Sequence, residues 1–90
     1  MSEDIVHDPD AKRFVLSVGG ASAHLDYVVR AAGARTVWDA VHTFVPPEAR
    51  GQGAADRLVR AFVAAARGAG ADLRGSCSYV GAWLARHPDA

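Results

Sequence analysis

The sequence has 90 residues, of which half are hydrophobic, and its ten basic and ten acidic side chains give a formal net charge of zero. This length predicts one domain, residues 1–90, with a core large enough to fold alone. The balanced charge lacks the strongly basic surface of nucleic-acid-binding proteins, so we expect no nucleic-acid partner.

The chain also lacks the usual signals for export or membrane insertion. Residues 1–10 are mostly polar and do not resemble a signal peptide, and no stretch approaches the ~20 apolar residues that cross a bilayer. Cys77 is the one cysteine, which excludes an intramolecular disulfide and is typical of a reducing compartment. These features predict a soluble cytoplasmic protein.

Three β-rich runs in the first half of the chain predict an antiparallel meander. They cover residues 14–18, 21–30 and 35–45, and a Gly-Gly pair between the first two runs is typical of a β-hairpin. Residues 1–10 are polar apart from Ile5 and Val6, and we expect them to form a frayed end that leads into a first edge strand.

Strand alternation predicts which side chains of the third run share a face. One face carries Val37, Asp39, Val41, Thr43 and Val45, and the other carries Trp38, Ala40, His42 and Phe44. Asp39 would therefore point away from His42. A carboxylate interrupts its face, so we predict that Asp39 is exposed to solvent.

An apolar stripe at helical spacing predicts a long helix over residues 53–67. The stripe consists of Leu58, Val59, Phe62, Val63, Ala65 and Ala66. Asp56 lies in the first turn, where it complements the helix dipole, and can pair with Arg60 one turn later. Gly68 and Gly70 are expected to end the helix.

A short strand over residues 71–78 and a second helix over residues 80–86 complete the chain. Because a helix connects the third strand to the last one, these two strands should be parallel neighbours. The predicted fold class is α/β of the α+β type, with a three-stranded antiparallel meander, a crossover helix, a parallel last strand and a C-terminal helix. We interpret both tryptophans, Trp38 and Trp83, as packing residues.

The loop between the third strand and the long helix has features of an anion-binding site. Pro46 and Pro47 stop strand pairing because neither offers an N–H group. Gly51 and Gly53 allow a tight turn, and the free N–H groups at the helix start favour an anion such as phosphate. An ordinary exposed turn is the alternative. The loop lacks the Gly-Lys-Ser/Thr of a P-loop, and its glycine spacing fits the dinucleotide fingerprint poorly.

The motif Arg50-Gly51-Gln52-Gly53-Ala54-Ala55 resembles the Arg/Gln-x-x-Gly-x-Gly/Ala signature of the GNAT superfamily of acyl-CoA-dependent N-acetyltransferases. The wider run HTFVPPEARGQGAADRLV, the later SCSYV and the closing LARHPD resemble the small stand-alone branch of that superfamily. The resemblance covers nearly the whole chain from Ile5 onward. It implies two parallel strands that splay apart, with acyl-CoA in the wedge between them.

The resemblance also implies acetyl-CoA, or coenzyme A, as the cosubstrate and names the residues that bind it. The pantetheine would lie along residues 41–45, and the backbone of the loop would hold the pyrophosphate. Arg50 or Arg57 would add positive charge, although a solvated Arg57 is the alternative. The implied cofactor-binding residues are Val45, Arg50, Gly51, Gln52, Gly53, Ala54 and Ala55.

Three residues are candidates for the chemistry, each with a structural alternative. Cys77 matches the family's Cys-x-Tyr segment and can act as an acetyl-accepting nucleophile, or fill space as a small hydrophobe. His42 can act as a general base or be a half-exposed strand residue. Tyr79 can protonate the departing CoA thiolate or pack under the second helix. Phe44 replaces a glutamate of the family pattern, so the resemblance does not support a glutamate-based mechanism here.

These observations predict an N-acetyltransferase that transfers an acetyl group to an amine of a small molecule or a protein, directly or through acetyl-Cys77. A non-catalytic CoA-binding module and a small interaction domain without a cofactor are the alternatives. The other three histidines, His7, His24 and His87, do not combine with Cys77 at metal-ligand spacing, so we expect no metal site.

Overall fold

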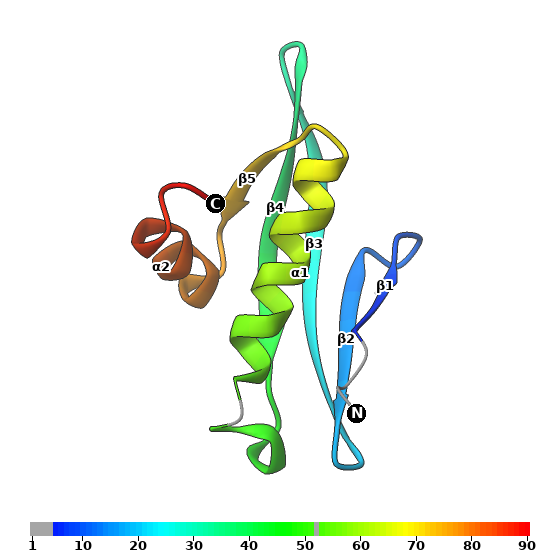
Figure 1. The fold of residues 1–90 in the computed structure, drawn as a ribbon. Coiled ribbons are helices and arrows are strands. Elements are labelled where there is room, and N and C mark those ends of the chain that lie inside the picture. The colour runs from blue at the N-terminus through cyan, green and yellow to red at the C-terminus, as the bar shows by residue number, and fades with distance from the viewer. Residues whose placement is uncertain (1–4, 52) are drawn as a thin grey trace.

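The computed structural model describes residues 5–51 and 53–90. Within them, five strands form one sheet in the order β1-β2-β3-β4-β5, and α1 lies across one face of it (Figure 1). The strands are β1 (Ile5–Asp8), β2 (Arg13–Val18), β3 (Ala21–Ala32), β4 (Arg35–Phe44) and β5 (Asp72–Gly75). Strands β1 to β4 pair antiparallel, and β5 pairs parallel with β4. The predicted fold class is confirmed, with four antiparallel strands rather than three because β1 pairs with β2.

The long helix α1 (Ala54–Gly68) covers the sheet with its apolar stripe. Its buried residues are Ala54, Leu58, Val59, Phe62, Val63 and Ala66, which matches the stripe predicted from the sequence apart from the half-buried Ala65. The Phe62 ring meets Phe14 of β2 edge-on, with ring centroids 6.3 Å apart. The predicted ion pair is present, since Asp56 Oδ2 lies 2.8 Å from Arg60 Nε. Gly70, with φ of 72°, closes the C-terminal end in the left-handed conformation that glycine adopts most readily.

A β-bulge in β4 changes the predicted faces of this strand. Tyr27 of β3 pairs with Ala40 and Asp26 pairs with His42, so Val41 is an extra residue without a partner on β3. Directly paired residues point to the same side, so Ala40 joins the buried Tyr27 under α1 while His42 joins Asp26 on the opposite face. The regular alternation predicted for residues 37–45 is therefore wrong beyond Ala40.

Asp39 departs most from its prediction. Its register partner Val28 lies on the face away from α1, so Asp39 and His42 share that face instead of pointing apart. Asp39 is also only 1% exposed, whereas we predicted a solvated side chain. The reason is that Arg30, Arg74 and Ser76 all contact its carboxylate.

The last strand is shorter than predicted, and the helix α2 (Ser78–Arg86) begins earlier. Gly75 ends β5 at the point where the backbone of α2 crosses it. A Cβ built on Gly75 would lie 2.5 Å from the Gly81 nitrogen, and one on Gly81 would lie 2.8 Å from the Gly75 carbonyl oxygen. Only glycine at both positions allows this approach, which brings the buried Val80 and Trp83 into the core.

Candidate functional site

The loop between β4 and α1 places two glycines in the left-handed conformation close to the start of the helix. It runs through the short 3₁₀ helix η1 (Pro47–Ala49) to Gly51 and Gly53, whose φ angles are 80° and 72°. Gly53 is the N-cap of α1 in the left-handed conformation. Arg50 Nε donates a hydrogen bond to the carbonyl of Val45, the residue after β4, at 3.2 Å, and this bond ties the loop to the end of β4.

A cavity of about 250 Å³ lies at this point. Its lining is Val45, Ala49, Arg50, Gly51, Gly53, Ala54, Ala55, Asp56 and Tyr79. We call it the loop cavity. Six of the seven cofactor-binding residues predicted from the sequence line it, and the seventh, Gln52, lies outside the described residues.

The loop cavity suits an anion. In α1 the N–H of Arg57 donates to the Gly53 carbonyl at 3.0 Å, so the N–H groups of Ala54 and Ala55 precede the helical ladder and have no partner within it. Asp56 lines the cavity, but its carboxylate accepts hydrogen bonds from Trp83 Nε1 at 2.7 Å and Arg60 Nε at 2.8 Å. Both hydrogen bonds lower the pKa of Asp56, with the bond from Trp83 having the larger effect, and they offset its negative charge. The residues present therefore fit the diphosphate of acyl-CoA.

Strands β4 and β5 separate next to the loop cavity. Their parallel pairing ends at Ala40 and Gly75, and the Cys77 N–H then donates to the Ala40 carbonyl at 2.9 Å. Beyond this bond, β4 continues to Phe44 with no β5 partner, because the chain turns into α2 (Figure 1). The edge of β4 beyond Ala40 thus has no strand partner among the described residues, and we call the region between this edge and the start of α2 the wedge.

Cys77 lies at the narrow end of this wedge, as the N-cap of α2 rather than the last residue of a strand. Its sulfur is partly buried and lies 3.6 Å from the Thr43 hydroxyl oxygen. Burial raises the pKa of this thiol, but the N–H of Val80, the Thr43 hydroxyl and further backbone N–H groups, including that of Tyr79, outweigh it. The net pKa lies below the ordinary value. This arrangement favours a reactive thiolate.

The structure places the other two candidates differently. Tyr79 is 38% exposed and lines the loop cavity. His42 is exposed on the sheet face away from α1, where its ring lies 5.7 Å from that of His24. Cys77 contacts Thr43, whose partner Leu25 is in the core, so the structure brings Cys77 and Tyr79 to the helix side and leaves His42 on the other.

Sequence reasoning missed Thr43 as a partner of Cys77. Regular alternation would also have placed Thr43 on the same face as Asp39, whereas the bulge at Val41 separates them. No local pattern in the sequence marks the bulge, and only the pairing with β3 reveals it.

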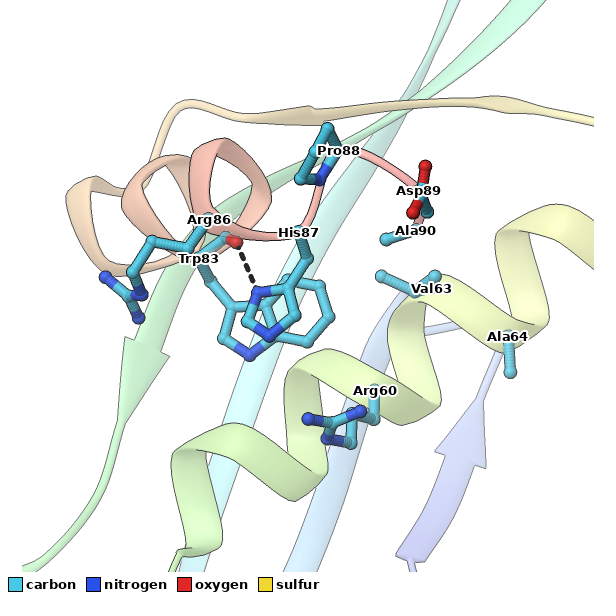
Figure 2. A pocket seen from close by; sticks show the side chains of 9 residues that line it. All are labelled: Arg60, Val63, Ala64, Trp83, Arg86, His87, Pro88, Asp89 and Ala90. Atoms are coloured by element: carbon cyan, nitrogen blue, oxygen red, sulfur yellow. Dashed lines mark hydrogen bonds between the residues drawn. The ribbon is translucent and has the colours of Figure 1, made fainter.

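A second and larger cavity, of about 500 Å³, lies between α1 and the C-terminal segment (Figure 2). The His87 ring stacks on the Trp83 indole with centroids 3.8 Å apart, and His87 Nδ1 donates to the Trp83 carbonyl at 2.8 Å. Arg60 lies over the same indole at 5.4 Å. Trp83 therefore connects the two cavities, because its indole N–H reaches Asp56 at the loop cavity.

In residues 5–51 and 53–90, no three His, Cys, Asp or Glu side chains are grouped so that they could hold a metal ion. None of the described helices has the length and apolarity to cross a membrane.

Comparison with known proteins was made by family and by individual sequence. Residues 13–90 match the family described as GCN5-related N-acetyl-transferase. This range includes the loop cavity, the wedge and Cys77. A search among curated proteins found no match. Since the family match spans most of the 90 residues, the chain belongs to the GCN5-related N-acetyltransferases.

Proposed function

We propose that this chain transfers the acetyl group of acetyl-CoA to an amine and that Cys77 carries the acetyl group between the two. Family membership suggests an acetyltransferase. The observation that supports the covalent route is the position of the thiol. Cys77 and its partner Thr43 each lie two residues from a residue that lines the loop cavity, Tyr79 and Val45 respectively.

In this proposal the loop cavity holds the diphosphate of acetyl-CoA and the thioester extends along the open edge of β4 toward Cys77. The N–H groups of Ala54 and Ala55 and the first-turn dipole of α1 favour the negative charge. Arg50 lies beside them, with its Nε bonded to the Val45 carbonyl.

The Cys77 thiolate then attacks the carbonyl carbon of the acetyl thioester. A new S–C bond forms, the S–C bond to CoA breaks, and CoA leaves as a thiolate that the Tyr79 hydroxyl can protonate. A neutral amine next attacks acetyl-Cys77. Cys77 leaves again as a thiolate, while the proton lost by the amine passes to water. We assign His42 no step at Cys77, because its ring lies on the other face of the sheet.

The covalent route is tested by intact-protein mass spectrometry after incubation with acetyl-CoA and no amine. We expect a single acetyl adduct on the native chain and none on Cys77→Ala. His42→Ala is the matched control, and we expect it to retain the adduct. The same samples are then assayed for release of free CoA with a panel of amines.

Three results would separate the parts of the proposal. Turnover by Cys77→Ala at the native rate would replace acetyl-Cys77 by direct attack of the amine on acetyl-CoA. A chain that binds acetyl-CoA but releases no CoA with any amine would be a CoA-binding module. Absence of binding would contradict the site itself.

A further inference from the structure

Asp39 is a buried carboxylate outside the loop cavity and the wedge. It lies on the sheet face away from α1, paired in register with Val28 and Arg74. Its side chain is 1% exposed, yet a strand position of this kind is filled at lower cost by an apolar residue. The buried carboxylate of Asp39 must therefore be stabilised by specific contacts.

The closest contacts of Asp39 are to Ser76. The Ser76 backbone N–H donates to Asp39 Oδ1 at 2.9 Å, and the Ser76 hydroxyl donates to Oδ2 at 2.8 Å. The two arginines are farther away, with Arg30 Nε at 3.3 Å and Arg74 Nε at 3.7 Å, and their side chains are 59% and 70% exposed. The carboxylate is therefore directed mainly at one residue of the turn between β5 and α2.

Ser76 immediately precedes Cys77, and the two residues are bound in the same way. The Ser76 N–H donates to the Asp39 side chain and the Cys77 N–H donates to the carbonyl of Ala40 at 2.9 Å. Two consecutive residues of β4 thus fix two consecutive N–H groups of the turn. This fixes the direction in which the chain enters α2, and with it the distance between the Cys77 sulfur and Thr43.

We propose that Asp39 is a positioning residue which, through Ser76, holds the Cys77 thiol against Thr43 and the first turn of α2. This inference rests on the proposed function for the importance of Cys77 in acetyl transfer. Its physical content, the orientation of the thiol, is measurable without any turnover.

Asp39→Ala, which removes both acceptors of the Ser76 bonds, provides the test, because positioning and charge predict opposite results. Loss of a nearby negative charge, acting alone, would stabilise the thiolate and lower the pKa of Cys77. Loss of the two bonds to Ser76 releases the thiol from the N–H groups and hydroxyl that favour its ionisation, and raises that pKa toward the ordinary value of about 8.5. The pKa is read from the rate of iodoacetamide alkylation as a function of pH, since Cys77 is the one thiol of the chain.

We expect the Cys77 pKa to rise in Asp39→Ala, and to rise by less in Ser76→Ala, which keeps the backbone bond. Asp72→Ala is the matched control, because it removes a carboxylate from the neighbouring strand that pairs with Arg35 and not with Ser76. We expect no rise there. If Asp39→Ala does not fold, Ser76→Ala decides alone.

A pKa that falls or stays unchanged in the folded variants would overturn the positioning role. A raised pKa in a chain that forms no acetyl adduct would support the positioning of the thiol and refute only the proposed acetyl transfer. The two failures are therefore distinguishable.

Discussion

The crossing of α2 over Gly75 gives the sharpest prediction for stability. In Gly75→Ala the new Cβ would meet three backbone atoms of α2 at 2.5, 2.8 and 2.9 Å. Backbone cannot rotate away as a side chain can, so α2 must move by about 1 Å to reach ordinary contact. This movement loosens the buried Val80 and Trp83. We expect the free energy of unfolding to fall by at least about 3 kcal/mol, the upper end for overpacked cores, and the melting temperature to fall by about 12 °C or more.

Gly68→Ala is the matched control for this prediction. Gly68 is the last residue of α1, a Cβ there would have no atom within 4 Å, and its φ is not positive. Alanine is the better helix former, so the unfolding free energy should rise by up to about 1 kcal/mol. Both variants are measured by urea denaturation followed by circular dichroism. A Gly75→Ala variant as stable as the native chain would refute the reasoning from the backbone crossing.

Three further predictions concern charge and burial. Ala55→Glu places a carboxylate in the loop cavity and should weaken acetyl-CoA binding at least about tenfold. The weaker binding is measured as a smaller rise in melting temperature on adding the ligand, and Ala64→Glu on the same helix should leave that rise unchanged. Asp56→Ala leaves the buried Trp83 indole N–H without its acceptor and should lower the free energy of unfolding by about 1–3 kcal/mol, measured by urea denaturation followed by tryptophan fluorescence. An equal loss of unfolding free energy in Asp56→Asn would contradict this explanation. Burial raises the pKa of Asp39, but the hydrogen bonds from Ser76 and Arg30 outweigh burial, so the pKa is lowered in the folded protein. The ionised Asp39 therefore stabilises the fold above the unfolded pKa of about 3.9, and this contribution is lost as the pH falls through the lower folded value. The urea concentration at the unfolding midpoint should therefore fall as the pH is lowered below about 4. It should fall less in Asp39→Asn, and a fall of the same size in that variant would count against the assignment.

The parts of the fold that could be predicted from the sequence are those written in local patterns. The stripe from Leu58 to Ala66 specified α1 within one residue at each end, and the connection through this helix required β5 to run parallel to β4. The loop motif placed six binding residues at one cavity because glycine conformation and free helix N–H groups are local properties.

The errors concern features that depend on partners distant in the sequence. Asp39 was predicted to be solvated because a carboxylate interrupts its face of the strand, but Arg30, Arg74 and Ser76 contact this carboxylate from other segments. The bulge at Val41 is likewise a property of the pairing between two strands. It moved Thr43 to Cys77 and His42 away from it.

The position of α1 has a consequence for how ligand binding and folding are linked. This helix supplies much of the apolar surface that covers the sheet, and its first turn is also a wall of the loop cavity. Loosening of the first turn of α1 would therefore change the shape of the cavity. Occupancy of the loop and global unfolding are coupled equilibria, and saturating ligand should slow the hydrogen exchange in β2 and β3 that proceeds through global unfolding.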